Sequence, residues 1–209
     1  MHLTGWKSAL LASFEILMIA VCLSALPAPP QPPAQAGSDE IALSLDPAQS
    51  KVHYTVDTTL HTVHGTFELK KGSQVRFDPE SGHTAGEIDV YATSGDSGNS
   101  SRDQRMHKEI LETQKYPDAI FRPTQIEGRV AREGASDVKI HGLLLLHGGQ
   151  HELVAMVHAE LAGDHWKGTA KFDVPYIQWG IKDPSNWLLK VKPVVNIELD
   201  MAGGLASSK

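Results

Sequence analysis

Apolar and polar side chains alternate along most of this chain. In residues 188–201 the apolar side chains at 189, 191, 195, 197, 199 and 201 are separated by mostly polar ones, and Pro193 indicates an edge or a bulge. This period of two is typical of a strand with one apolar and one solvated face. The pattern recurs within 51–57, 63–69, 87–93, 137–146, 152–161 and 165–174. Turn residues separate these segments, so the sequence predicts an antiparallel sandwich or barrel whose apolar faces enclose packed core or a guest molecule.

One segment departs from this alternation. Residues 101–114 place Met106 and Ile110, and less neatly Leu111, on one face of a helix. Its end is indicated by Tyr116-Pro117, and its start by the capping candidates Asn99, Ser100 and Ser101. A single helix in an otherwise all-β domain usually plugs or covers a barrel, and we expect that here.

The strand predicted over 137–146 is apolar on both faces near its end. Leu143 and Leu145 lie on the opposite face from Leu144. An apolar outer face needs a cover. We expect the helix to supply it, with a second subunit in a homodimer as the alternative.

The first 36 residues lie outside the strand pattern. Lys7 precedes an apolar run over 9–26, and a proline-rich stretch follows over 27–33. We predict a signal peptide or N-terminal anchor over 1–26, a Pro-rich linker over 27–40 and one domain over 41–203. A cleaved signal would give a periplasmic or secreted protein, whereas an uncleaved N-terminus would associate the protein with a membrane. Cys22 is the only cysteine, so the exported domain would fold without an internal disulfide.

The charge pattern argues against a nucleic acid partner. The formal net charge is −6 at pH 7, and the lysines and arginines are scattered instead of forming a basic stripe. Any association with lipid would therefore depend on apolar contact.

Small residues lie on strand faces that otherwise carry Phe, Val and Leu. A barrel filled by its own side chains would need more bulk at these positions, so they indicate a hollow interior. The alternative is that the glycines mark bulges and bends, which closed barrels also need. The residues concerned are Gly65, Gly142, Gly168, Ala155, Ala159 and Ala170.

Five short motifs occur in a fixed order along the chain: Val63-His64-Gly65-Thr66-Phe67, Arg102-Asp103, Lys115-Tyr116-Pro117 with Phe121, His141 to Gly148, and Trp179-Gly180-Ile181. Together they resemble the YceI-like family of exported proteins that bind polyisoprenoid lipids, over about residues 41–202. The resemblance implies an all-β fold, an extended lipocalin-like antiparallel β-barrel with one short helix inserted around residues 101–114. It also implies an elongated apolar channel for an isoprenoid tail, such as that of a quinone or a polyprenyl phosphate.

The chain departs from the family pattern in three places. Arg105 stands where the family commonly has a histidine, 145–153 lacks the usual proline, and Trp179-Gly180 replaces a Phe-Gly or Phe-Asn pair. A permanent cation in place of a titratable ring bears on the preference for a ligand head group.

The predicted ligand site has an apolar wall and a polar end. For the polar end we expect Arg102 and Arg105 to meet a phosphate or quinone oxygen, with Asp103 orienting one of them. The alternative, which we favour, is that Arg102 and Asp103 bind each other or the backbone and attach the helix to the barrel. The wall residues are those that lie on the apolar face of their predicted strands: Tyr54, Val56, Val63, Phe67, Ile88, Val90, Phe121, Ile140, Leu144, Val157, Phe172 and Ile197.

Other signals carry less weight. Gly95-Asp96-Ser97-Gly98 is similar to a protease nucleophile loop, but only 96 residues precede Ser97, too few for the histidine of that family. The eleven histidines lack carboxylate or cysteine partners at ligand spacing, so no metal site is predicted. No activated nucleophile, phosphate loop or carboxylate pair supports catalysis.

The sequence therefore predicts an exported protein, not an enzyme, that holds a polyisoprenoid-type amphiphile for transport, storage or stress protection. No cofactor is expected beyond this bound lipid. The alternatives are a binder of another amphiphile, such as a fatty acid or its amide, and a lipid-modifying enzyme on the same barrel. A structural stress protein with a filled core is a further alternative.

Overall fold

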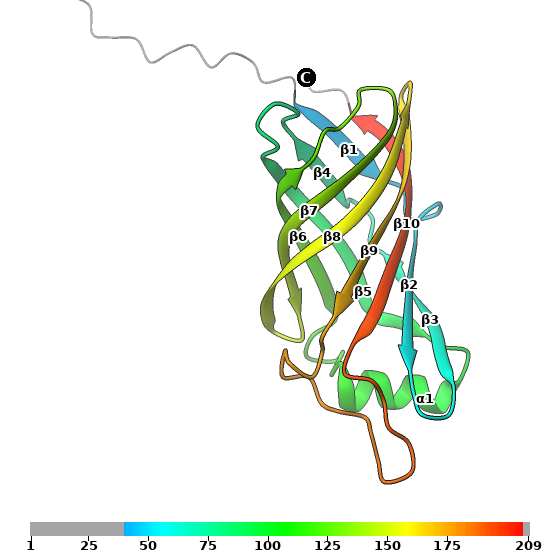
Figure 1. Cartoon of the computed structure of the whole chain (residues 1–209). Coiled ribbons are helices and arrows are strands. Elements are labelled where there is room, and N and C mark those ends of the chain that lie inside the picture. Colours follow the sequence, from blue (N-terminus) through cyan, green and yellow to red (C-terminus); the bar gives the residue numbers. More distant parts are fainter. Residues whose placement is uncertain (1–39, 207–209) are drawn as a thin grey trace, which may run out of the picture. The chain divides into compact units, whose positions relative to one another are not determined.

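The computed structural model describes residues 40–206, which form an antiparallel β-barrel with one short helical segment (Figure 1). The predicted fold class is confirmed. The signal or anchor over 1–26 and nearly all of the linker over 27–40 lie outside the described residues. The ten strands of the described part are β1 (Ile41–Leu45), β2 (Lys51–Asp57), β3 (Thr62–Leu69), β4 (Gln74–Phe77), β5 (Thr84–Asp96), β6 (Asp118–Glu127), β7 (Gly134–Leu146), β8 (Gly149–Ala162), β9 (His165–Val174) and β10 (Val195–Ala206).

Eight strands close the barrel wall. Their order is β5-β3-β2-β10-β9-β8-β7-β6, and β6 pairs back onto β5. Beyond the end of β2, β10 pairs with β1, and the first residues of β5 pair with β4. The two short strands β1 and β4 therefore complete the wall at one end of the barrel. Figure 1 places this end opposite the helix.

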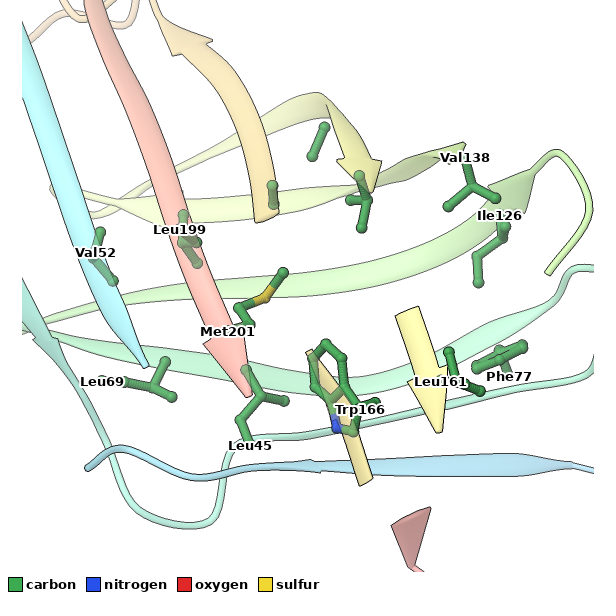
Figure 2. Close-up of a cluster of buried hydrophobic side chains, with 13 residues drawn as sticks. Leu45, Val52, Leu69, Phe77, Ile126, Val138, Leu161, Trp166, Leu199 and Met201 are labelled. Carbon is green, nitrogen blue, oxygen red and sulfur yellow. The ribbon is translucent and has the colours of Figure 1, made fainter. Parts of the chain in front are cut away.

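The end formed by β1 and β4 is filled by packed side chains, and we call it the closed end. Phe77 and Leu161 are each only 2% exposed. The indole of Trp166 is buried, and its Nε1 donates a hydrogen bond to the carbonyl oxygen of Ser44 at 3.0 Å. Figure 2 shows this cluster, in which Leu45 and Met201 also point into the interior.

The helical segment lies at the other end, which we call the helix end. It consists of α1 (Ser100–Arg105) followed by one π-helical turn, η1 (Met106–Ile110). Asn99 is the N-cap among the three candidates, since its side chain accepts a hydrogen bond from the backbone N–H of Arg102.

The helix ends earlier than the sequence predicted. The backbone N–H of Leu111 donates to the carbonyl oxygen of Met106, five residues back, and Glu112 has a left-handed φ of 46°. A wide turn followed by a left-handed residue stops the helix. The prediction that Tyr116-Pro117 ends it was therefore wrong.

The prediction that the helix covers Leu143 and Leu145 was also wrong. Met106 and Ile110 face the barrel interior, so the apolar side of the helix points inward. Leu143 and Leu145 remain half-buried on the outside of β7, beside Arg122 and Ile120 of the neighbouring strand.

The strand predicted over 188–201 begins only at Val195. Residues 175–194 form a long connection at the helix end, and Pro193 lies in this loop. Proline has no N–H for a sheet ladder, which explains why the strand starts after it. Within residues 40–206, no helix has the length and apolar character needed to cross a bilayer.

Candidate ligand-binding cavity

The barrel encloses a cavity of about 420 Å³. This is within the range of roughly 300–1,000 Å³ that is usual for small-molecule sites. Side chains of every strand line it because alternate residues of each strand point inward. The cavity extends from the packed cluster of the closed end to the helix and the 175–194 loop.

The burial pattern indicates that the interior is hollow. No side chain among residues 40–205 is fully buried, although the barrel wall is closed. Phe67, Phe121, Phe172 and Ile140 all face inward, yet each is only partly buried. Their remaining exposure is to the cavity. A filled core would have covered these central side chains completely.

The small residues contribute to this space in two ways. Ala155, Ala159 and Ala170 line the cavity directly. Gly65 and Gly142 instead accommodate aromatic rings: a Cβ on Gly65 would lie 2.4 Å from the Tyr54 ring, and one on Gly142 would lie 2.6 Å from the Phe121 ring. These glycines allow large wall residues to lie flat across the neighbouring strand.

All twelve side chains predicted for the apolar wall line the cavity. Arg102 and Arg105 line it as well, whereas Asp103 does not. Contact of any of these residues with a ligand stays a prediction.

Polar lining groups gather at the helix end. Thr58 and His61 come from the β2–β3 connection, and Arg102 and Arg105 from α1. His61 and Arg105 are exposed, so this end forms the mouth of the cavity. The geometry provides a deep apolar compartment with hydrogen-bonding groups at its entrance.

Arg102 and Asp103 connect the helix to the end of β5. The Nε of Arg102 donates to Ser97 Oγ at 2.7 Å, and a terminal guanidinium nitrogen donates to the Ser97 carbonyl oxygen at 2.9 Å. Asp103 accepts a hydrogen bond from the backbone N–H of Ser97 at 3.0 Å. This arrangement favours the structural role for both residues, and it occupies the Ser97 hydroxyl.

Arg105 is held more loosely. Its Nε lies 3.7 Å from Glu109 Oε2, one turn along the helical segment. The same carboxylate oxygen accepts a shorter hydrogen bond, 3.0 Å, from Lys182 in the 175–194 loop. That bond lowers the pKa of Glu109. Arg105 therefore has donors left for a ligand at the mouth.

Tyr176 is a lining residue that the sequence analysis missed. Its side chain is 5% exposed, and its hydroxyl has no hydrogen-bond partner among the described residues. Burial raises its pKa to about 12, so the hydroxyl stays protonated. The sequence contains a signal for this position, because Tyr176 follows Phe172 and Val174 at the same spacing of two residues, directly beyond β9.

The histidines do not assemble into a metal site in the part of the chain that the structure describes. No group of three or more His, Cys, Asp or Glu side chains could hold an ion there. Several histidines lie beside single carboxylates instead, such as His147 at 2.8 Å from Glu112.

Solved structures with the same fold include two bacterial proteins. BcnA of Burkholderia cenocepacia has 16% sequence identity and a TM-score of 0.62, covering 77% of this chain and 99% of its own. A polyisoprenoid-binding domain from Saccharophagus degradans, implicated in plant cell wall breakdown, has 14% identity and a TM-score of 0.60, covering 79% and 99%. At these identities the likeness concerns the fold.

Comparison with curated protein sequences gives no match. The YceI-like domain family, in contrast, matches residues 43–202, which is nearly the entire barrel. With the closed barrel and its apolar cavity, this match establishes that the chain belongs to the family of YceI-like domains.

Proposed function

We propose that this protein binds a polyisoprenoid-type amphiphile, a quinone or a polyprenyl phosphate, and holds it without changing it chemically. The observation that carries the proposal is the long apolar cavity whose polar lining groups gather at the helix end. Membership in the YceI-like family supports it, as does the polyisoprenoid-binding domain that shares the fold.

The tail supplies most of the binding free energy. Burying one methylene group stabilises a complex by about 0.8 kcal/mol, so one five-carbon unit contributes roughly 3 to 4 kcal/mol. Two or three buried units offset most of the association cost, which is roughly 4 to 15 kcal/mol. Such binding selects weakly among apolar chains, so discrimination has to come from the head group.

The head group is placed at the helix end in this proposal, with the tail directed toward Trp166 and Phe77. Arg105 is the cation for a phosphate or a quinone oxygen. Tyr176 is a neutral donor, because its side chain lines the cavity and its buried hydroxyl has no hydrogen-bond partner among the described residues. A hydrogen bond to a charged group contributes about 1.5 to 3 kcal/mol. Arg102 acts mainly by holding the helix at the mouth.

We further propose a periplasmic or secreted location, on the basis of the signal-like residues 1–26. A carrier there would transport, store or protect a lipid that water does not dissolve.

Native mass spectrometry followed by lipid extraction tests the proposal. The purified full chain is expected to carry an isoprenoid adduct. Ala155→Phe, which adds a ring inside the cavity, should lose the adduct. Val154→Phe is the matched control, because Val154 is the next residue of β8 and points outward with 46% exposure.

Other results would decide between the alternatives. Recovery of a fatty acid or its amide would replace the isoprenoid with another amphiphile. Turnover of the recovered lipid on incubation with the protein would identify an enzyme. A barrel that binds no lipid at all, with Ala155→Phe and wild type indistinguishable, would end the proposal.

A further inference from the structure

Two neighbouring tight turns at the helix end carry large apolar side chains at their tips. The first, Thr58–His61, joins β2 to β3, and the second, Asn186–Leu189, lies in the 175–194 loop. In each turn, the backbone N–H of the first residue donates to the carbonyl oxygen of the fourth, at 3.0 Å and 2.8 Å. The two central residues of each turn, at 59–60 and 187–188, are exposed.

Side-chain hydrogen bonds stabilise both turns. Thr58 Oγ1 accepts from the backbone N–H groups of Leu60 and His61, at 3.2 and 3.1 Å. Asn186 Oδ1 accepts from the N–H groups of Leu188 and Leu189, at 2.9 and 2.7 Å. Neither tip needs an apolar residue to keep its conformation.

The two turns lie side by side. The backbone N–H of Thr59 donates to the carbonyl oxygen of Lys190 at 2.9 Å, and Thr58 forms a bridge with Val191. Lys192 also forms an ion pair with Asp57 at 2.9 Å. The tip residues therefore form one surface, which we call the apolar tip: Leu60, Trp187 and Leu188.

The apolar tip is strongly exposed. Trp187 is 91% exposed, Leu60 66% and Leu188 63%. Turn tips usually carry Gly, Asn, Asp, Ser or Pro. Side chains that touch so little of their own protein contribute little to its folding, so their presence indicates a contact with something else.

We propose that the apolar tip docks the cavity mouth onto a phospholipid bilayer, with Trp187, Leu60 and Leu188 inserted to the boundary between the lipid head groups and the acyl chains. Tryptophan prefers this interface because its ring is apolar and its N–H is polar. Charge adds little to this contact, because Lys182 and Lys192 are paired with Glu109 and Asp57 at 3.0 and 2.9 Å. The insertion therefore depends on the three apolar side chains.

A protein partner fits this surface less well. Stable protein interfaces bury about 800 Å² on each side over a broad patch. Two narrow turn tips offer less than that, whereas shallow insertion into lipid needs only a few side chains.

The apolar tip lies next to the mouth of the cavity. His61 and Leu189, the last residues of the two turns, line the cavity, and so does Val191 two residues farther along the chain. A lipid leaving the bilayer would therefore enter the mouth without crossing water. The docking goes beyond the proposed function, because the three tip side chains do not line the cavity.

Fluorescence quenching tests the docking on the full chain. Vesicles of phosphatidylglycerol and brominated phosphatidylcholine quench tryptophans that enter the acyl region. The signal of Trp187 is isolated by subtracting the emission of Trp187→Phe from that of the wild type. This readout is chosen because residues 1–26 could hold the chain on a vesicle by themselves. We expect the Trp187 signal to be quenched as vesicles are added.

Variants separate the apolar tip from the barrel wall. Leu60→Ser with Leu188→Ser, measured with and without Trp187→Phe, should weaken the vesicle partition of Trp187 roughly tenfold. Val154→Ser with Met156→Ser is the matched control, since those side chains are 46% and 54% exposed on the barrel wall. The control pair should partition as the wild type does.

Two results would overturn the docking. One is a Trp187 signal that stays unquenched at saturating vesicle concentrations. The other is a dimer in sedimentation that dissociates in the Leu60→Ser/Leu188→Ser variant without any vesicles present. Lipid adducts in native mass spectra of this variant report on the cavity separately, and we expect them to match the wild type.

Discussion

Tyr176 places a phenol hydroxyl where the surrounding wall offers it no partner. An unpaired buried polar group costs a fold about 1 to 3 kcal/mol. The Tyr176 side chain lines the cavity while its hydroxyl oxygen is covered, so a small rotation of the ring would bring the hydroxyl to a ligand oxygen that could accept its hydrogen. One side chain would then destabilise the empty protein and stabilise the filled one.

Tyr176→Phe should therefore act in opposite directions on stability and binding. We expect the lipid-free variant to gain about 1 kcal/mol in its free energy of unfolding, because the unpaired hydroxyl is gone. We also expect affinity for a quinone to fall several-fold, which corresponds to the loss of one neutral hydrogen bond. Urea unfolding and a quinone titration measure the two effects. Unchanged affinity would remove Tyr176 from the head-group site.

Asp89 presents a second unpaired group, on β5. Its Oδ1 is buried and has no hydrogen-bond partner among the described residues. Burial, with the nearby charge of Glu87, raises its pKa above the ordinary value of 3.8. Because the folded state binds the proton more tightly than the unfolded chain, this carboxyl lowers stability as pH rises through its folded pKa.

Asp89→Asn should remove this pH-dependent cost. The variant and the wild type are expected to be similar below about pH 3.8, where the carboxyl is protonated in both states. The variant should become the more stable protein as pH rises toward neutrality. Urea unfolding across this pH range gives the comparison. Glu160→Gln is a contrasting control, because its carboxylate lies 2.9 Å from Lys167 and that pairing lowers its pKa, so its loss brings no gain.

At the scale of elements, the strands could be predicted from the sequence, whereas the end of the helix and the start of β10 could not. Alternation placed the wall residues correctly because a period of two is a local property of the chain. The π-helical turn after Arg105 depends on tertiary contacts, which a local pattern does not contain. The late start of β10 depends on Pro193, which the sequence analysis interpreted as an edge or a bulge within the strand. Arg102 and Asp103 were ambiguous for a similar reason, since their partner Ser97 comes close only when the helix folds back onto β5.

Gly142 shows how closely one strand approaches the next. A Cβ there would lie 2.5 Å from the Arg122 carbonyl oxygen and 2.6 Å from the Phe121 ring. The backbone oxygen cannot turn away as the end of a flexible side chain can. The glycine is therefore required by the pairing of β6 with β7.

Gly142→Ala is expected to destabilise the barrel by about 1 to 3 kcal/mol, the usual cost of overpacking. Gly204→Ala is the matched control on β10, because its nearest contact would be 3.6 Å from Ser44 Oγ, an ordinary separation. Chemical unfolding of both variants measures the difference. Equal stabilities would show that β6 and β7 can separate locally to admit the methyl group.

At the scale of the whole molecule, the barrel combines a tightly packed closed end with an unfilled middle. Each wall strand pairs antiparallel with a neighbour on both sides, so the sheet does not depend on a packed centre. The cavity of about 420 Å³ nonetheless leaves its lining side chains without contacts on one side. A tail that fills the cavity should supply those contacts and stabilise the folded state.

Removal of the bound lipid should therefore lower the melting temperature. A ligand present at one hundred times its Kd stabilises a folded protein by about 2.7 kcal/mol. For a domain of this size that corresponds to roughly 5 to 10 °C. Thermal unfolding before and after delipidation, and again after adding a polyprenyl phosphate, measures the shift. Ala155→Phe should melt at one temperature under all three conditions, because its ring takes the place of the tail, while Val154→Phe should follow the wild type. If delipidation left the wild-type melting temperature unchanged, the tail would not be contacting the cavity wall.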